Sequence, residues 1–321
     1  MIKIGLVGLG GMGTVHYTNY QYIQDCKVAA VVGTTEKDKQ TADSWGLTEY
    51  STITDMLDHE DIDVVDICTP TFTHYQLTKE ALLRNKNVIV EKPFTLHLKE
   101  AEELFALSEN SGKHVYVGQV IRFAKDTEIL EQLIQNKEYG EVKDAYFARL
   151  SKVPGWSTGN WMLDKNKSGQ LAFDLHIHDL DTIIHLFGTP LGYSYTVVKS
   201  KESKYTELYR IQYDFDAYHV AAEAAWFHAD YPFNASWRVY FENAVAVGNS
   251  KQVIIYPYDG ETKIIKIHEK QIPTGINLAP TEMFYSELSY YVDCVRKNID
   301  PPKTPKQEIL NVVRILEKLT F

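Results

Sequence analysis

The sequence predicts an α/β protein: an N-terminal doubly wound parallel sheet, then an α+β domain with a large, mostly antiparallel, open sheet. Three observations favour this fold class. A strand-like run, Ile2–Val7, leads directly into closely spaced glycines. Short apolar runs then alternate with helical patterns over the first third of the chain, which is typical of a parallel sheet covered on both faces. After about residue 140, longer alternating segments separated by turn residues predict antiparallel strands.

The glycines after the first strand have the spacing G-x-G-x-x-G, and a helical pattern follows them. In this strand–turn–helix setting the first glycine permits a sharp turn, the second lets a pyrophosphate approach the backbone, and the third lets helix and strand pack. The phosphates are then held by the free N–H groups of the helix N-terminus. We therefore expect a dinucleotide-binding turn made of Gly8, Gly10, Gly11, Met12 and Gly13.

The rest of the first domain follows from strand and helix signals. Thr73 and Gln76 have the spacing of a capping box, which predicts a helix that begins near His74. The next helix is expected to end at Gly112. We expect further strands at residues 28–32, 64–68, 88–91 and 115–119. A Rossmann-type dinucleotide domain is therefore predicted for residues 1–121.

The second domain is predicted for residues 122–321. It begins with a helix at 127–135 and has two further helices at 173–187 and 283–298. A last helix, at about 305–318, could pack back near the first domain. Its expected strands lie at residues 142–150, 193–198, 205–213, 219–226, 237–241 and 253–256.

Bulk properties exclude several classes of protein. The 321 residues carry a net charge of −10, which argues against nucleic-acid and anionic-membrane partners because both reward a basic surface. No apolar run approaches the ~20 residues of a membrane span. The three cysteines are odd in number and far apart. They are typical of reduced thiols, so we expect a cytoplasmic protein without a cysteine metal site.

Three segments carry a family resemblance. The first is T-P-x-x-x-H at residues 69–74, the second is E-K-P at residues 91–93, and the third is D-x-x-x-H-x-x-D at residues 174–181. Together with the glycine turn they resemble the Gfo/Idh/MocA family of NAD(P)-dependent sugar and polyol oxidoreductases. The resemblance extends from residue 1 to about residue 190.

The resemblance implies hydride transfer between NAD(P) and a hydroxyl or carbonyl of a sugar, an inositol-like cyclic polyol or a sugar derivative. His178 would be the base, or the acid in the reverse direction, a role that suits a side chain titrating near neutral pH. Lys92 would hold and polarise the substrate oxygen, and Asp174 would orient His178 or Lys92. Helical spacing places Asp174 and His178 on one face with Asp181 and His185. For Asp181 and His185, a solvent-exposed face without a catalytic role is an equally good interpretation.

The cofactor prediction depends on the end of the second strand. Gly33 occupies the place where NAD enzymes usually carry an acid that binds the ribose. Thr34 and Thr35 could bind a 2′-phosphate with Lys37 adding charge, so the sequence favours NADP over NAD, although Glu36 could still serve the ribose of NAD. The resemblance implies further cofactor contacts from Thr69, Pro70, His74, Glu91 and Lys92.

Substrate contacts are expected from Arg122 and Trp161, besides the three catalytic residues. Arg122 matches a family position near the substrate, and Trp161 could stack on a sugar ring or simply belong to the core. His176 is expected to be a packed histidine. A metal site of His176 with His178 and His185 is not expected, because no cysteine or suitable carboxylate completes it on a helix. By resemblance, the bond before Pro93 can be cis.

Two rival functions remain open at this point. One is a catalytically silent, dinucleotide-binding regulator, against which the presence of Lys92, Asp174 and His178 argues. The other is a reductase of a non-sugar carbonyl or a dihydrodiol. By analogy with the family, the open face of the second sheet is expected to form a homodimer or homotetramer.

Overall fold

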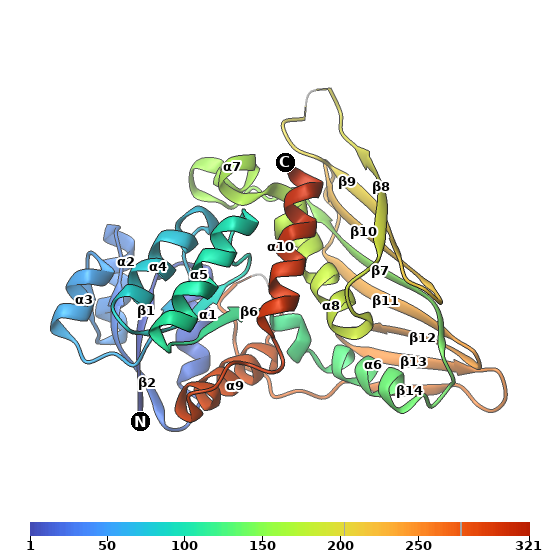
Figure 1. Cartoon of the computed structure of the whole chain (residues 1–321), viewed down its shortest axis with the longest axis horizontal. Coiled ribbons are helices and arrows are strands. Elements are labelled where there is room, and N and C mark those ends of the chain that lie inside the picture. Colours follow the sequence, from blue (N-terminus) through green and yellow to red (C-terminus); the bar gives the residue numbers. More distant parts are fainter. Residues whose placement is uncertain (202, 277) are drawn as a thin grey trace. The chain divides into compact units, whose positions relative to one another are not determined.

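The computed structural model describes residues 1–321 except residues 202 and 277. The described chain divides into two compact units (Figure 1). The first comprises Met1–Val120 and Glu269–Val313, and the second comprises Ile121–His268 and Arg314–Phe321. The sequence-based boundary assigns all of residues 122–321 to the second domain, whereas Glu269–Val313 is part of the first unit.

Six parallel strands form the sheet in the described part of the first unit. They are β1 (Ile2–Val7), β2 (Cys26–Val32), β3 (Thr48–Tyr50), β4 (Val64–Ile67), β5 (Asn87–Glu91) and β6 (Val115–Gly118). Their order is β3-β2-β1-β4-β5-β6, which is the doubly wound arrangement and confirms the predicted fold class. Because the strands are parallel, the carboxyl ends of β1, β4 and β5 are neighbours at one edge of the sheet.

The helices of the first unit pack on this sheet (Figure 1). Val65 and Ile67 of β4 face an apolar cluster shared with the helices that follow β3, β4 and β5, so Asp66 between them faces the opposite side. The described helices are α1 (Gly11–Tyr20), α2 (Glu36–Trp45), α3 (Ile53–His59), α4 (His74–Leu83), α5 (Leu98–Ser111) and α9 (Met283–Lys297). α10 (Lys306–Thr320) begins one residue later than predicted and continues into the second unit.

The ends of α4 and α5 test two sequence predictions. α5 ends at Gly112, which adopts the left-handed conformation with φ +63° as predicted. The predicted capping box before α4 is wrong, because the Thr73 side chain accepts no hydrogen bond from a described N–H group of the helix. A 3₁₀ turn, Thr71–Thr73, leads straight into the helix. Thr73 therefore has helical rather than extended backbone angles, and its hydroxyl donates to the Pro70 carbonyl at 2.8 Å.

Eight strands form the sheet in the described part of the second unit. They are β7 (Val142–Lys152), β8 (Gly192–Val198), β9 (Leu208–Asp214), β10 (His219–Phe227), β11 (Asn234–Phe241), β12 (Ala244–Asn249), β13 (Gln252–Pro257) and β14 (Lys263–Lys266). The order is β14-β13-β12-β11-β7-β10-β9-β8. Among these described pairs only β7 and β10 run parallel, so the mostly antiparallel prediction is confirmed.

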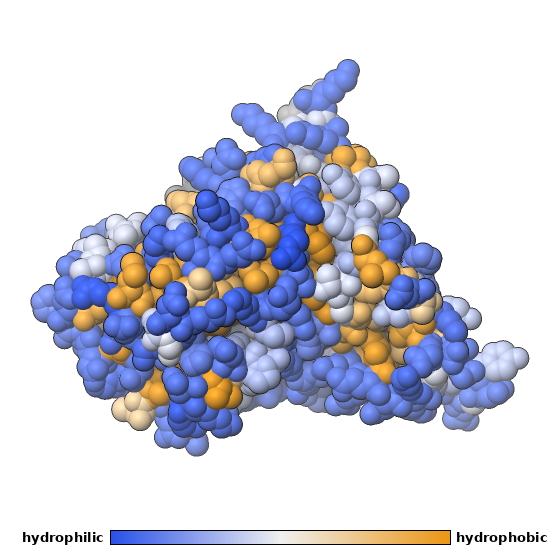
Figure 2. All heavy atoms as spheres, viewed as in Figure 1, coloured by the Kyte–Doolittle hydropathy of each residue, from blue (hydrophilic) through white to orange (hydrophobic). Residues whose placement is uncertain are grey.

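Helices cover one face of this second sheet. α6 (Lys125–Asn136) and α8 (Ile177–Phe187) both pack on it and on each other (Figure 1). The predicted helix at 173–187 begins with a π-helical turn, Ala172–His176, before α8 starts. Polar side chains cover most of the visible surface, with apolar side chains in smaller groups (Figure 2). Within the described residues, every helix is too short or too polar to cross a bilayer.

Candidate functional site

The glycine turn joins β1 to α1 with little space to spare. Gly8 has φ +91°, and a Cβ there would lie 2.8 Å from the Cys68 carbonyl oxygen and 2.9 Å from Cγ2 of Thr69. A Cβ on Gly13 would overlap the carbonyl oxygen of Gly8. These two positions therefore require glycine for packing between the turn, the end of β4 and the helix.

Gly10 differs from the other two glycines of the motif. It is the exposed N-cap residue of α1, and no described atom lies within 4 Å of the place where its Cβ would be. Gly11 and Met12 follow in the first turn of the helix, and a Cβ on Gly11 would contact Cγ2 of Ile276 at 2.9 Å. The open space at Gly10, beside a helix N-terminus, is the feature that a pyrophosphate needs.

The loop after β2 is organised by Asp38. Its Oδ2 accepts hydrogen bonds from the Thr34 N–H at 3.1 Å, the Thr35 N–H at 3.0 Å and the Thr35 hydroxyl at 2.8 Å. Thr35 and Asp38 form the capping box of α2, and a Cβ on Gly33 would collide with side-chain atoms of both Asp38 and Glu49. The loop donors predicted to bind a 2′-phosphate are therefore already bonded to a carboxylate. Lys37 is exposed in the first turn of α2.

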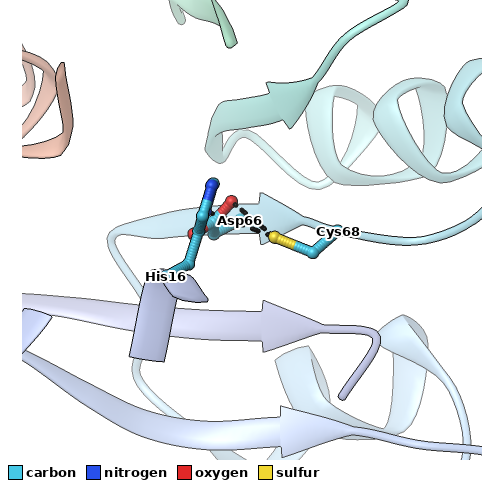
Figure 3. A group of neighbouring side chains, drawn as sticks. All are labelled: His16, Asp66 and Cys68. Carbon is cyan, nitrogen blue, oxygen red and sulfur yellow. Dashed lines mark hydrogen bonds and ion pairs between the residues drawn. The ribbon is translucent and has the colours of Figure 1, made fainter. Parts of the chain in front are cut away.

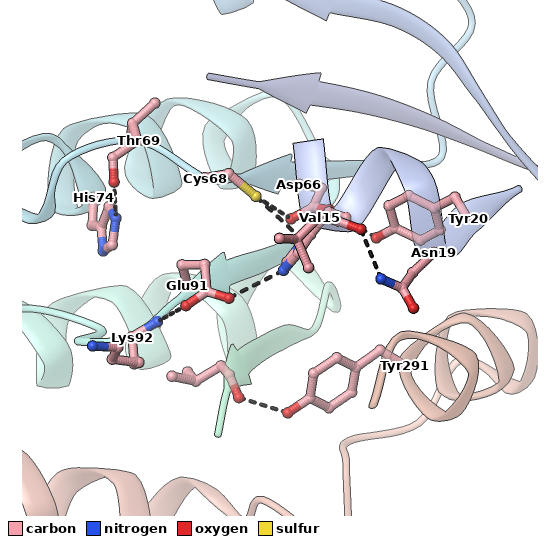
Figure 4. Close-up of polar contacts among 12 residues, drawn as sticks. Val15, Asn19, Tyr20, Asp66, Cys68, Thr69, His74, Glu91, Lys92 and Tyr291 are labelled. Atoms are coloured by element: carbon pink, nitrogen blue, oxygen red, sulfur yellow. Dashed lines mark hydrogen bonds and ion pairs between the residues drawn. The ribbon is translucent and has the colours of Figure 1, made fainter. Parts of the chain in front are cut away.

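Lys92 follows the last residue of β5, at the carboxyl edge of the sheet, where ligands of such sheets bind. The Lys92–Pro93 bond is cis, as in the family resemblance. Lys92 is half-buried, and its backbone N–H donates to Oε2 of Glu91 at 3.0 Å (Figure 4). Glu91 is itself buried, so its carboxylate is directed into the fold.

His74 connects two segments of this edge. Its Nδ1 lies 2.8 Å from the Pro93 carbonyl oxygen. Its Nε2 lies 2.8 Å from the Thr69 carbonyl oxygen (Figure 4). Burial lowers the pKa of the imidazole, so a neutral ring donates one of these bonds. His74 thus fixes the Thr69–Pro70 turn relative to Pro93, while Thr69 and Pro70 themselves are half-buried beside the glycine turn.

A buried polar cluster lies behind the same edge. His16 of α1 lies between two carboxylates: Nδ1 is 2.8 Å from Oδ2 of Asp66, and Nε2 is 3.1 Å from Oε1 of Glu91. Cys68 Sγ is 3.2 Å from Nδ1 of His16 (Figure 3). Within the described residues, His16, Asp66 and Cys68 are also the one group whose donor atoms are close enough to share a metal ion.

In the second unit, the π-helical turn carries Asp174 and the first turn of α8 carries His178. Both side chains are half-buried. The expected single α-helical face is therefore interrupted, since a π turn has a wider repeat than an α-helix. Such turns are frequent at functional sites.

Arg122 lies in a different environment from Asp174 and His178. It is fully buried, and its guanidinium donates to both carboxylate oxygens of Asp181, from Nε at 2.7 Å and from Nη2 at 2.6 Å. Its Nη1 lies 3.3 Å from Nδ1 of His185. Arg122 therefore contacts two successive turns of α8, through Asp181 and His185. The alternative of a solvated face is thus wrong for Asp181, which is buried.

The remaining predicted residues behave as follows. Trp161 is half-buried in the 3₁₀ segment Thr158–Leu163. His176 is fully buried and packed, as expected, with Nε2 2.6 Å from the Tyr213 hydroxyl, and burial lowers its pKa to about 3. The neighbouring Asp179 of α8 accepts from Nη2 of Arg149 at 2.9 Å.

Sequence reasoning missed two functional candidates. Asp38 could have been found, because Thr35 and Asp38 have capping-box spacing directly after the second strand. His16 gave no such signal: it is one polar residue in a helix, and its partners Asp66 and Glu91 are 50 and 75 residues away. Only the strand order brings those partners together.

Comparisons with known proteins agree with the fold. Residues 2–119 match the family model "Oxidoreductase family, NAD-binding Rossmann fold", and residues 128–259 match the "GFO/IDH/MocA C-terminal domain". The chain is 31% identical over 192 residues to the uncharacterized oxidoreductase YdgJ of Escherichia coli, covering 60% of this chain and 55% of that protein. It is 29% identical over 230 residues to the glucose-6-phosphate 3-dehydrogenase of Bacillus subtilis, covering 65% and 64%. The alignments thus cover 55% and 64% of the lengths of these two relatives.

A solved structure extends the likeness to almost the whole chain. An oxidoreductase from Agrobacterium radiobacter, in complex with NAD⁺, L-tartaric acid and magnesium, has a TM-score of 0.87. The alignment covers 98% of this chain and 94% of that one, at 16% identity. At this identity the likeness concerns the fold.

Proposed function

The chain belongs to the Gfo/Idh/MocA oxidoreductase family, since models of both family domains match it. On this premise we propose that it transfers a hydride between a nicotinamide dinucleotide and a hydroxyl or carbonyl carbon of a sugar, a cyclic polyol or a sugar derivative. The observation that carries the proposal is Lys92, half-buried at the carboxyl end of β5, on the same sheet edge as the glycine turn of β1.

The first unit fits a dinucleotide. Gly10 leaves open space beside the N-terminus of α1. The first turn of that helix carries no acidic side chain that would repel a phosphate. The pyrophosphate would be held by Gly10, Gly11 and Met12, and the nicotinamide, when bound, supplies the acceptor or donor of the hydride.

The proton follows a separate path through this chain's own side chains. The Lys92 ammonium would hold the substrate oxygen and stabilise the negative charge that develops on it as its proton leaves. His178 would accept the hydroxyl proton, or return it during carbonyl reduction. Asp174 would orient His178 and balance the charge. The catalytic roles of these three residues come from the family resemblance, and their partial exposure is compatible with contact to a small molecule.

The hydrogen bonds in the loop after β2 favour NAD over NADP as the cofactor, in contrast to the expectation from Gly33, Thr34 and Thr35. Asp38 already accepts the hydrogen bonds of the two threonines, and Glu49 adds a second carboxylate beside Gly33. A 2′-phosphate entering this loop would meet like charges, which costs several kcal/mol when they are juxtaposed. A ribose 2′-hydroxyl would instead find acceptors.

The relatives support a sugar substrate. The Bacillus relative is named as a dehydrogenase of glucose-6-phosphate, and it shares 29% identity over 230 residues with this chain. Sugars and cyclic polyols offer the secondary alcohols on which such hydride transfer operates. The proposal is for this class of substrate rather than for one sugar.

A substrate screen with a matched lysine pair tests the proposal. NADH formation is followed at the nicotinamide absorbance with a panel of sugars, sugar phosphates and inositols, for wild type, Lys92→Ala and Lys99→Ala. Lys99 is an exposed lysine of α5 and serves as the control. We expect turnover with wild type and Lys99→Ala and its loss in Lys92→Ala, with NADH still bound by all three. Equal turnover by Lys92→Ala would overturn the assigned role, and cofactor binding without turnover of any compound would favour a silent regulator.

A further inference from the structure

The buried cluster behind β5 has an unusual bonding pattern. Both ring nitrogens of His16 face carboxylate oxygens, Asp66 on one side and Glu91 on the other, and the His16 side chain has no exposed surface. An ionised carboxylate can only accept hydrogen bonds. A neutral imidazole has a single N–H and could satisfy just one of these partners, whereas a protonated ring donates to both.

The surroundings of the ring agree with a protonated state. Burial by itself opposes the charge, but the carboxylate of Asp66 holds the pKa of His16 well above its usual value. The other titratable groups that face the cluster are Tyr20 of α1, whose hydroxyl donates to Asp66 at 2.8 Å, and Glu287 of α9. Burial, followed by the charge of Glu91, raises the pKa of Glu287, so this third carboxyl is favoured in its neutral form.

Glu91 transmits the position of His16 to Lys92. One carboxylate oxygen of Glu91 faces Nε2 of His16, and the other accepts the backbone N–H of Lys92 at 3.0 Å (Figure 4). A Cβ on Gly118 of β6 would lie 3.3 Å from Oε1 of Glu91, so that strand packs tightly against the carboxylate. Because both oxygens and one flank are engaged, the Glu91 side chain has little freedom to turn.

The two ends of this chain of contacts are functionally distinct. His16 lies in the second turn of α1, the helix whose N-terminus begins at the glycine turn. Lys92 lies just beyond β5, two strands away from β1. We propose that His16 is a positioning residue for Lys92: its two ring N–H groups bind Asp66 and Glu91 to helix α1, and Glu91 in turn holds the Lys92 backbone. This inference rests on the proposed function, in which Lys92 contacts the substrate.

The same atoms also raise the question of a metal ion. Cys68 Sγ lies 3.2 Å from Nδ1 of His16 and 3.6 Å from Oδ1 of Asp66, which are hydrogen-bond separations for sulfur. Burial raises the pKa of the Cys68 thiol, which disfavours the thiolate that a metal binds. A proton-bonded cluster therefore fits these residues better than a metal site does.

Two isosteric variants separate the two bonds of the ring. In His16→Gln the amide nitrogen can occupy the place of Nε2 and still donate to Glu91. In His16→Asn the shorter amide can replace only Nδ1 and reach Asp66. We expect His16→Asn to lower kcat about 100-fold, the size of effect that a small misplacement of a reacting group produces. His16→Gln should retain most of kcat, and both variants should change the Kd for NADH little.

Tyr20→Phe is the matched control. It removes the hydroxyl that donates to the same oxygen of Asp66 but leaves the contact between His16 and Glu91. We expect a lower Tm with unchanged kcat. If kcat falls in His16→Gln as far as in His16→Asn, or falls in proportion to Tm across all three variants, His16 has only a structural role and the inference is overturned.

A measurement without substrate keeps this result separate from the proposed function. In the ¹H–¹⁵N NMR spectrum of the full chain, the Lys92 amide signal should shift in His16→Asn and in Glu91→Gln but stay in place in His16→Gln and Tyr20→Phe. An unchanged Lys92 signal in His16→Asn overturns the inference even if Lys92 is catalytic. Stoichiometric zinc in the purified protein that is lost in Cys68→Ser overturns it as well.

Discussion

Arg122 and Asp181 form a buried pair joined by two hydrogen bonds of 2.7 and 2.6 Å, one to each carboxylate oxygen. Planar, bidentate pairs of this kind are strong and specific in geometry. The arginine precedes α6 and the aspartate lies in the second turn of α8, so the pair fixes the helix that carries His178. The family resemblance had suggested that Arg122 contacts substrate, and the two roles predict different results.

Asp181→Asn is expected to destabilise the protein by about 3–5 kcal/mol, because it leaves the buried guanidinium without its counter-charge. Urea unfolding monitored by tryptophan fluorescence measures this loss. Arg122→Lys should destabilise too, since an ammonium cannot replace the two-pronged contact. An Arg122→Lys enzyme with wild-type stability but a raised KM for substrate would instead support direct substrate binding.

Substitutions at two glycines of the turn should affect different properties, the stability of the fold at Gly13 and cofactor binding at Gly10. Gly13→Ala is expected to cost roughly 3 kcal/mol of folding free energy, because its Cβ would overlap the Gly8 carbonyl oxygen. Gly10→Ala should leave the free energy of unfolding nearly unchanged, since no described atom is near that Cβ, yet weaken NADH binding by blocking the backbone approach. Denaturant unfolding and NADH fluorescence titration of both variants check this. Equal NADH affinity of Gly10→Ala and wild type would place the pyrophosphate elsewhere.

The loop after β2 predicts cofactor preference. Wild type should bind NADH more tightly than NADPH, because Asp38 and Glu49 oppose a 2′-phosphate. The double variant Asp38→Asn, Glu49→Gln should improve NADPH binding by about tenfold, or 1.4 kcal/mol, while altering NADH binding less. Titration calorimetry with both cofactors measures this. The charge-matched control is the double variant Asp216→Asn, Glu261→Gln, which removes two exposed acids of the second unit. A wild-type preference for NADPH would contradict the argument.

The burial of His176 leads us to expect that it makes the free energy of unfolding fall as the pH is lowered. Its pKa is lowered to about 3 in the folded protein by burial and then by Arg149, whereas the unfolded chain has the usual value near 6.5. The unfolded state therefore binds more protons in this range, so the stabilisation from His176 is present above about pH 6.5 and is lost as pH falls toward 3. His176→Gln can keep a hydrogen bond to Tyr213 without titrating. Its unfolding free energy should fall less steeply than that of wild type between these pH values, and parallel curves would refute the assignment.

Much of the fold follows from local sequence patterns, and the exceptions have physical reasons. β1, the glycine turn and the alternation of strands and helices are local, periodic signals, and they were sufficient for the doubly wound sheet. β3 and β14 are very short, and β12 lies among turn residues, so their patterns were too brief to identify. The false capping box at Thr73 arose because a 3₁₀ turn changed the backbone angles at the expected N-cap.

The site was less accessible to sequence reasoning than the fold. Motif spacing identified Lys92, Asp174 and His178, whose roles stay predictions. It could not show that Glu91 turns inward to His16, because that contact depends on β4 and β5 lying beside β1. It also assigned Thr34 and Thr35 to a phosphate, since the competing acceptor on Asp38 becomes apparent only when the first turn of α2 is formed.

Isotope transfer tests the central claim most directly. The enzyme is incubated with NAD⁺ and each active sugar or polyol deuterated at its carbinol carbons, and the recovered NADH is analysed by mass spectrometry and NMR. Our account predicts one deuterium at C4 of the nicotinamide, on a single face, with none transferred by Lys92→Ala. NADH formation without deuterium, or saturable NAD⁺ binding with no transfer from any compound of this class, would contradict it.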